Sequence, residues 1–164
     1  MAGPRMTLQG GPRGGKSGFS MSLKGRALRL LAGREQSRAE LQKKLSPHAE
    51  TPEQLTQVLD ELEAKDFISE VRVLDSVVRR RSGRFGASRI KHELLGKGLN
   101  PERVAEAVSQ LKVSELERAR EIWRKKFAEP AVDQAGRAKQ MRFLAGRGFG
   151  GDVIRRVIAG GDDD

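Results

Sequence analysis

The apolar residues of this chain repeat about every 50 positions, and this period limits the possible folds more than any other feature. A shift of 49 places Leu41, Leu45, Leu55, Leu59 and Leu62 onto Ile90, Leu94, Val104, Val108 and Leu111. A shift of 50 places Leu94, Gly96, Gly98, Leu99, Val104 and Val108 onto Leu144, Gly146, Gly148, Phe149, Ile154 and Ile158. Such a period predicts an array of similar units, each needing its neighbours to complete its core.

Within each repeat, the apolar residues have the three-to-four-residue spacing of amphipathic helices. Capping boxes, in which a Ser or Thr and a Glu or Gln three residues later satisfy each other's backbone amides, are predicted at Ser37–Glu40, Thr51–Gln54 and Ser114–Glu117. Pro52 stands at a first helical position, where its missing amide proton costs nothing. Glycines mark the predicted helix ends: Gly96, Gly98 and Gly160.

These patterns together predict an all-α monomer made of three tandem three-helix units, at residues 22–67, 69–112 and 114–159. Because each unit contacts only the next, we expect an elongated, curved array. The repeat is imperfect at Gln140, which stands where Ile90 predicts an apolar residue. The expected apolar faces of the third unit are Ala119, Trp123 and Phe127, then Ala138, Met141, Leu144 and Ala145.

The two ends of the chain differ in composition from the repeats. Residues 1–20 are rich in Gly and Pro and are expected to form a disordered basic tail, and residues 160–164 form an acidic tail. The first tail fits the phosphate-binding pattern G-x-x-x-x-G-K-S at Gly10, Gly15, Lys16 and Ser17. That motif requires a buried strand before the loop, and Met6–Gln9 is too short and polar to provide one. We therefore predict no nucleotide site there.

The formal net charge of +10 predicts an anionic partner: nucleic acid, an acidic protein face or a membrane surface. No apolar run approaches the roughly 18 residues of a membrane span, and the start of the chain lacks the apolar core of a secretory signal. We therefore expect a soluble intracellular protein that does not enter the membrane.

The composition also argues against catalysis and metal binding. The chain has no cysteine, and its two histidines, His48 and His92, are far apart in sequence. Most acids stand at helix caps or one turn from a cation, as Glu40 does from Lys44. The sequence thus predicts a protein that is not an enzyme and has no cofactor and no metal site.

The basic residues are the candidate binding residues. One set surrounds the predicted turn between two helices of the second unit, and the other lies on the equivalent helix of the third unit: Arg79, Arg80, Arg84, Arg89, Lys91 and Lys97, then Arg137, Lys139, Arg142 and Arg147. A stacked array would align the two sets into one stripe. A solvated basic surface without a partner is the competing interpretation.

Aromatic residues are few, and none is Tyr. Trp123 and Phe127 share a helix face with Ala119, which favours a place in the core over stacking on bases. Phe85 lies inside the basic turn. It is either a contact residue or a side chain that folds back onto the helices.

Four sequences in this order are similar to the RecX family of regulatory proteins: Ala27–Ala32, Ser37–Leu41, Arg89–Leu94 and Arg137–Phe149. The similarity extends from Ala27 to Ile158. It implies a fold of three tandem three-helix repeats, which agrees with the repeat found independently.

The resemblance further implies a bacterial cytoplasmic modulator of the RecA recombinase. Members of the family bind in the groove of the RecA–DNA filament, beside single- or double-stranded DNA. They inhibit ATP hydrolysis, strand exchange and the co-protease function of the SOS response. The alternative is a stand-alone basic helical module that binds DNA or RNA without RecA.

Overall fold

The computed structural model describes residue 3 and residues 20–160, and this part of the chain is helical without any strand. The phosphate-binding pattern at Gly10–Ser17 and the acidic residues 162–164 lie outside the described residues. The elements are α1 Leu23–Gly33, α2 Arg38–Leu45, the short 3-10 helix η1 Ser46–His48, α3 Pro52–Ala64, α4 Glu70–Arg81, α5 Ala87–Gly96, α6 Pro101–Val113, α7 Glu115–Phe127, α8 Gln134–Gly146 and α9 Gly151–Ala159.

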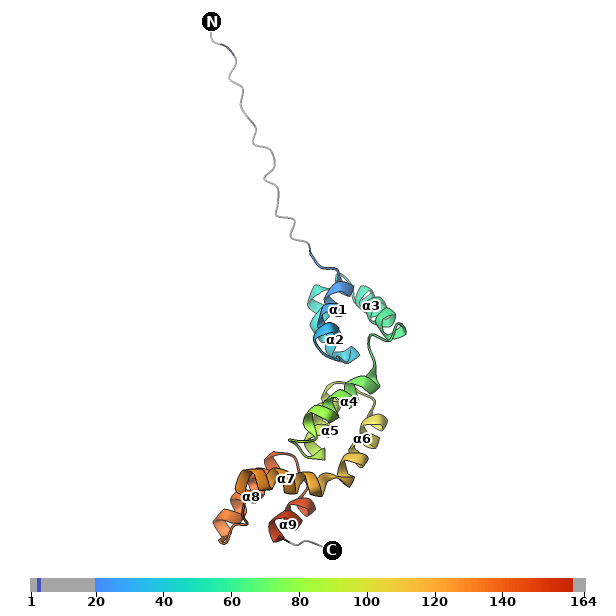
Figure 1. Cartoon of the computed structure of the whole chain (residues 1–164). Coiled ribbons are helices and arrows are strands. Elements are labelled where there is room, and N and C mark those ends of the chain that lie inside the picture. Colours follow the sequence, from blue (N-terminus) through green and yellow to red (C-terminus); the bar gives the residue numbers. More distant parts are fainter. Residues whose placement is uncertain (1–2, 4–19, 161–164) are drawn as a thin grey trace.

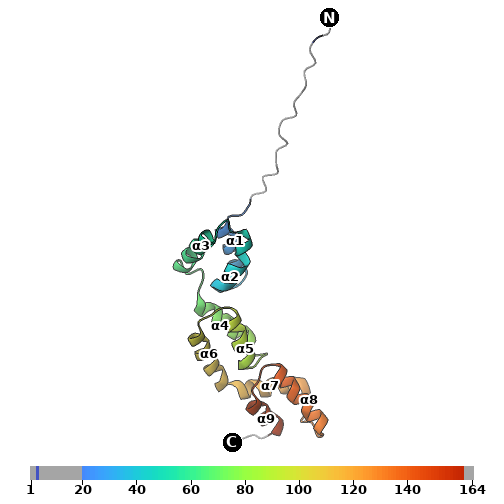
Figure 2. The ribbon, with the colours of Figure 1, turned by 180° about the vertical axis from the view of Figure 1, so that it is seen from behind.

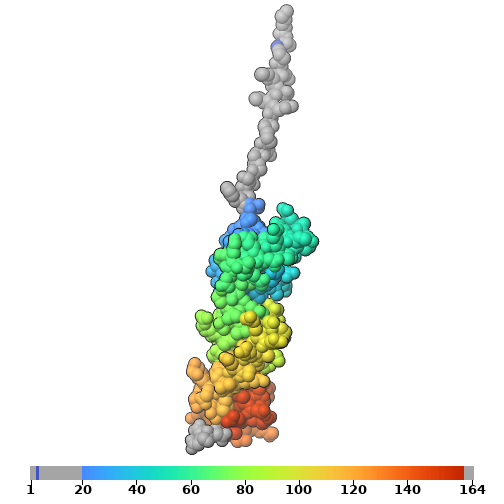
Figure 3. Space-filling model, turned by 90° about the vertical axis from the view of Figure 1, so that its right-hand side faces the viewer, coloured from blue at the N-terminus to red at the C-terminus, as the bar shows by residue number. Residues whose placement is uncertain are grey.

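The helices are stacked along one long axis, in the order of the sequence (Figures 1 and 2). We refer to α1–α3 as the first unit, α4–α6 as the second and α7–α9 as the third. The space-filling view shows a narrow column in which consecutive units touch (Figure 3). The column bends where α6 meets α7, because Ser114 both ends α6 and begins α7. The prediction of an all-α, elongated and curved array is confirmed.

Each unit has its own apolar core. The buried residues of the first are Leu23, Ala27, Leu41, Leu45, Leu55, Leu59, Leu62 and Ile68. Those of the second are Val73, Val77, Ala87, Ile90, Leu94, Leu99, Val104, Val108 and Leu111. Those of the third are Ala119, Trp123, Leu144, Phe149, Ile154 and Val157. Since the three clusters do not merge, the positions of the units depend on the contacts between them.

The capping box at Ser37 is present. Ser37 Oγ accepts a hydrogen bond from the Glu40 amide at 3.1 Å, and Glu40 Oε2 accepts one from the Ser37 amide at 3.2 Å. Thr51 caps α3 through the Gln54 amide at 3.1 Å, but the Gln54 side chain accepts from the Glu50 amide at 2.8 Å instead of from Thr51.

The predicted capping box at Ser114 is wrong. Ser114 has no room to cap α7 because α6 runs directly into it. Its hydroxyl donates to the Leu111 carbonyl at 3.3 Å and accepts from Arg118 Nε at 3.1 Å. Glu115 is buried, and its carboxylate accepts a hydrogen bond from the Ala87 amide of the second unit at 3.1 Å.

Gln140 occupies the core position where the repeat predicts an apolar residue. It is 5% exposed, and its side-chain oxygen accepts from Trp123 Nε1 at 3.1 Å and from the Ala131 amide at 3.4 Å. Its Nε2 donates to the Glu129 carbonyl at 3.1 Å. The glutamine is therefore tolerated because both ends of its amide have partners.

The rest of α8 agrees with the predicted face only in part. Leu144 is buried, as predicted, whereas Met141 and Ala145 point outward, and Phe143 packs on the core although it was not on the predicted face. Trp123 is in the core, as predicted, and Phe127 packs against it. The rings of Phe127 and Phe143 meet edge to face with centroids 5.3 Å apart.

Backbone groups of the second and third units contact each other directly. We call this contact joint 2. The Gly86 amide donates to the Arg147 carbonyl at 2.8 Å. A Cβ at Gly86 would overlap the carbonyl group of Gly148, and Gly148 itself has φ +88° and packs against Arg89. Glycine is thus required on both sides, for space at Gly86 and for backbone conformation at Gly148.

Arg118 completes joint 2 from α7. Its Nη1 donates to the Ser82 and Phe85 carbonyls at 2.8 and 2.7 Å, and its Nη2 donates to the Leu111 carbonyl at 2.9 Å. Burial lowers the pKa of Arg118, and the nearby carboxylate of Glu115 opposes that shift. The side chain thus satisfies carbonyls at the end of α6 and in the turn after α4.

We predict that Gly86→Ala destabilises the protein by about 1–3 kcal/mol, because the added methyl group must displace rigid backbone instead of a mobile side chain. Thermal unfolding followed by circular dichroism measures the effect. Gly96→Ala is the control, since a Cβ there meets nothing within 4 Å, and it should stabilise α5 by up to about 1 kcal/mol. A Gly86→Ala protein as stable as the parent would contradict the backbone contact.

We predict that Gln140→Leu lowers the free energy of unfolding by about 1–3 kcal/mol, because Trp123 Nε1 and the Glu129 carbonyl then lose their partner. Urea unfolding can be followed by the fluorescence of Trp123, the only tryptophan of the chain. Met141→Leu, at the neighbouring 39%-exposed position, should change little. Equal stability of the two variants would show that the buried amide is dispensable.

Candidate nucleic-acid and partner interface

The ten basic residues predicted from the sequence lie on three helices and the segments that follow them. Eight are exposed: Arg79, Arg80, Arg84, Arg89, Lys91, Arg137, Lys139 and Arg142. The remaining two, Lys97 and Arg147, are partly buried. They directly follow α5 and α8, and both lie where one unit meets the next.

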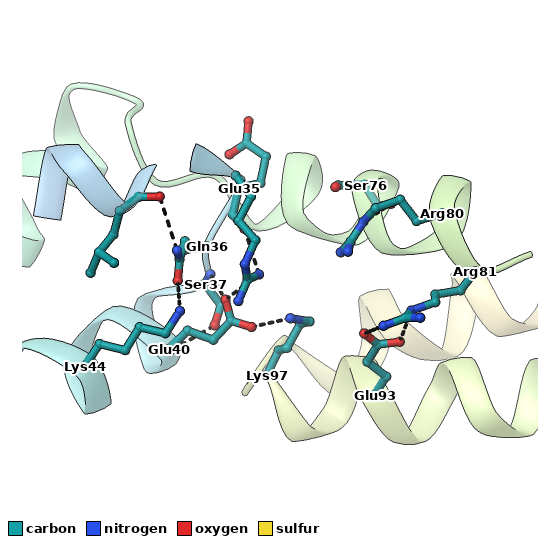
Figure 4. Close-up of polar contacts among 12 residues, drawn as sticks. Glu35, Gln36, Ser37, Glu40, Lys44, Ser76, Arg80, Arg81, Glu93 and Lys97 are labelled. Carbon is teal, nitrogen blue, oxygen red and sulfur yellow. Dashed lines mark hydrogen bonds and ion pairs between the residues drawn. The ribbon is translucent and has the colours of Figure 1, made fainter. Parts of the chain in front are cut away.

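The end of α4 concentrates positive charge. Arg79, Arg80 and Arg81 occupy its last turn, where the helix dipole favours cations. Arg80 Nε donates to the Ser76 carbonyl of its own helix at 3.3 Å, and Arg81 pairs with Glu93 of α5 at 3.1 Å (Figure 4). Arg81 therefore joins the two helices, while Arg79 forms no ion pair within residues 20–160.

The turn after α4 and the exposed side of α5 add further charges without acidic partners. Within residues 20–160, neither Arg84 nor Lys91 forms an ion pair, and both are exposed. With Arg79 they make three cations around one helix–turn–helix whose charge the fold does not neutralise. Such side chains are suited to an external anion.

Lys97 has a structural role. Its ammonium forms an ion pair with Glu40 of the first unit, and both side chains are largely buried (Figure 4). Arg72 makes a second connection, to Glu35 at 2.9 Å. Gly98, with φ +73°, lies against Ala39. These contacts form joint 1, between the first and second units.

The electrostatics of joint 1 centre on Glu40. Burial raises the pKa of this carboxyl, but hydrogen bonds from Lys97 and the Ser37 amide, with the charges of Lys97 and Arg34, outweigh burial and lower the pKa below its usual range. Glu40 is thus held as a carboxylate while it caps α2 and pairs with the next unit.

Arg89 and Arg147 meet at joint 2. Arg89 Nη1 donates to the Gly146 carbonyl at 3.0 Å. The guanidinium carbons of Arg89 and Arg147 lie 4.2 and 5.6 Å from the centre of the Phe85 ring, and that of Arg81 lies 5.6 Å away. Phe85 also packs on the core of the second unit, so it folds back and its ring is occupied by cations.

The third-unit set lies on α8. Arg137 Nε donates to the Ala131 carbonyl at 3.4 Å, and Lys139 and Arg142 are exposed. Because Arg89 at the start of α5 reaches Gly146 at the end of α8, the two basic sets meet at joint 2. The roles of Arg118 and Glu115 could not be predicted from the sequence, since nothing in their local pattern indicates contacts with residues about 30 positions earlier.

The described residues contain no group of three His, Asp or Glu side chains that could hold a metal ion. Among them, no helix has the length and apolar character needed to cross a lipid bilayer.

Comparison with known proteins decides the family. A model of the RecX third three-helix domain matches residues 114–158. The regulatory protein RecX of Leptothrix cholodnii is 52% identical over 138 residues, which cover 84% of this chain and 88% of the relative. The chain belongs to the RecX family. The regulatory protein RecX of Ralstonia nicotianae is 44% identical, covering 87% of this chain and 89% of its own length.

Solved structures of RecX proteins share the fold. The crystal structure of RecX from Lactobacillus salivarius superposes with a TM-score of 0.68 at 20% identity, covering 84% of this chain and 92% of that one. Another crystal structure of a regulatory protein RecX gives the same TM-score and covers 82% of this chain and 70% of its own. At this identity the likeness concerns the fold alone.

The ion pair of joint 1 predicts a dependence of stability on pH. Because the pKa of Glu40 is lowered in the folded protein, its contribution is present above the unfolded value of about 4.3 and is lost as the pH falls through the folded value. Lys97→Met should therefore be less stable at pH 7 and lose less stability between pH 5 and pH 3. Urea unfolding by circular dichroism across this range measures both effects. Lys43→Met, at an exposed lysine, should keep the parental profile.

Proposed function

We propose that this chain binds the RecA–DNA filament and inhibits the ATP hydrolysis, strand exchange and co-protease activity of RecA. It acts in the bacterial cytoplasm as a monomer, without catalysing a reaction and without a cofactor. Its RecX relatives are named regulatory proteins, which supports regulation as the general role.

The observation that carries the proposal is the set of exposed cations without ion pairs around α4, α5 and α8. Arg79, Arg84 and Lys91 project from the second unit, and Lys139 and Arg142 project from the third. Their positive charge suits the phosphates of DNA and acidic protein surface beside it. An elongated, bent column is also suited to lie along a groove.

The second candidate is a stand-alone nucleic-acid-binding module. The same exposed cations favour it, because they need only phosphates. The two functions differ in one respect: a filament regulator changes RecA activity at concentrations where it does not remove RecA from DNA, whereas a plain binder acts on DNA alone.

We predict that changing Arg79, Arg84 and Lys91 together to Gln weakens inhibition of DNA-dependent RecA ATP hydrolysis. Each lost phosphate contact should reduce the slope of log affinity against log salt by roughly 0.7–0.9. Helix content and melting temperature should change little, because these side chains are exposed. Arg89 is left unchanged because its side chain holds joint 2.

The matched control changes three exposed cations outside the set, Lys43, Lys112 and Arg124, to Gln. It has the same net charge as the test variant and should inhibit like the parent. If the test variant keeps parental inhibition and salt dependence, the assignment to α4 and α5 is wrong. If neither parent nor variants affect RecA while all bind DNA, the stand-alone module is correct.

A further inference from the structure

The first unit contains a cavity of about 630 Å³ between α1 and α2 that is largely open to solvent. Its volume lies within the range of small-molecule sites, roughly 300–1,000 Å³. None of the ten basic residues predicted from the sequence lines it. The described residues around it are Met21, Arg26, Arg29, Leu30, Gly33, Arg34, Gln36, Lys44, Leu45 and His48.

The walls of the cavity are held in place by Gln36. This side chain is buried, and its Nε2 donates to the Leu30 carbonyl at 3.2 Å while its oxygen accepts from Lys44 Nζ at 2.7 Å (Figure 4). The hydrogen bonds tie the end of α1 to the end of α2. The cavity is therefore part of the folded unit.

The lining combines an apolar surface with positive charge. Leu30 is half-buried and Met21 is 40% exposed, so both present apolar surface, and the fully buried Leu45 lies behind them. Arginine, lysine and histidine supply the remaining functional groups, and none of the described lining residues is acidic. A ligand that fits this lining has an apolar part and an anionic part.

Two of the arginines remain without an acidic partner. Arg34 pairs with Glu40 at 3.5 Å and Lys44 is bound to Gln36. Arg26 and Arg29 form no ion pair within residues 20–160, although they lie one helical turn apart on α1. Like charges at this spacing repel each other, so an anion between them would be stabilising.

A phosphate group satisfies this arrangement better than a carboxylate does. The guanidinium fork binds phosphate oxygens in a bidentate manner, and several arginines around one cavity match the multiple oxygens and higher charge of a phosphate. Bases stack on guanidinium planes and pack on apolar surface. The apolar and basic sides of the cavity thus match the base and the phosphate of one nucleotide.

We infer that the first unit carries a nucleotide-binding pocket between α1 and α2. The base lies against Leu30 and Met21, and the phosphate is bound by Arg26 and Arg29. The nucleotide is either free or part of a single-stranded nucleic acid, and the chemistry of the pocket is the same for both. The pocket is separate from the basic set of α4, α5 and α8, and its occupancy does not require RecA.

Binding is measured with the full chain in the absence of RecA. The probes are thymidine monophosphate, followed by calorimetry, and a fluorescein-labelled ten-nucleotide oligothymidine, followed by anisotropy. Inorganic phosphate is the third probe and lacks a base. Measuring direct binding keeps this test independent of filament inhibition, so either idea can fail alone.

Two variants test the two halves of the pocket. Gly33→Leu fills the cavity without changing charge, since Gly33 lines it and a Cβ there meets nothing within 4 Å. Arg26→Gln with Arg29→Gln removes the phosphate partners. Lys43→Gln with Lys112→Gln is the control of equal charge, at exposed lysines outside the lining.

Both pocket variants and their control are made in a chain that also carries Arg79→Gln, Arg84→Gln and Lys91→Gln, which removes the exposed cations of α4 and α5 that are proposed to bind DNA. In this background the pocket variants should bind the oligonucleotide at least about tenfold more weakly than the control, because a charge-assisted contact or the base site is lost. Gly33→Leu should keep its weak affinity for inorganic phosphate. Binding of thymidine monophosphate at similar strength identifies a free nucleotide as the ligand, and binding of the oligonucleotide alone identifies a strand.

The inference is overturned if Gly33→Leu binds the oligonucleotide like the parent, because the affinity would then come from general surface charge. It is also overturned if a peptide that contains glutamate and leucine displaces the labelled oligonucleotide at a lower concentration than thymidine monophosphate does. Circular dichroism checks that the variants are folded. If Gly33→Leu is not folded, equal binding by the arginine variant and its control overturns the inference.

Discussion

The backbone contact between Gly86 and Gly148 sets how the third unit lies on the second. Because the apolar cores of the units are separate, no shared hydrophobic surface fixes their relative position. The glycines allow the start of α5 to approach the end of α8, and Arg118 and Glu115 then bind the backbone groups around that contact. The same contact brings Arg89 of the second unit and Arg147 of the third unit to the ring of Phe85.

The cations of this RecX-family chain fall into two groups that look alike in the sequence. Lys97, Arg89 and Arg147 hold units together through a carboxylate, a carbonyl group and an aromatic ring. Arg79 and Arg84 project from the surface with no acidic partner among the described residues. Only the second group can be changed without disturbing the array, which is why the residues changed to weaken filament binding are exposed cations of this kind.

Periodicity and capping made the helices predictable from the sequence, because both depend on residues within four positions of each other. Ser37 and Gly98 could be assigned in this way. The roles of Ser114, Gln140 and Lys97 could not, since each depends on a partner supplied by another helix. The basic residues could therefore be predicted from the sequence only as one group. Distinguishing those that hold units together from those that project from the surface required the contacts between units.

Joint 1 differs in kind from joint 2. Its principal polar contacts are the ion pairs Glu40–Lys97 and Glu35–Arg72, whereas joint 2 includes a hydrogen bond between the Gly86 amide and the Arg147 carbonyl. Dissolved salt screens the partly exposed pair Glu35–Arg72, but it has little effect on the largely buried pair Glu40–Lys97 or on a buried amide–carbonyl bond. We therefore expect the bending stiffness of joint 1 to fall in part with rising ionic strength, and that of joint 2 to change less.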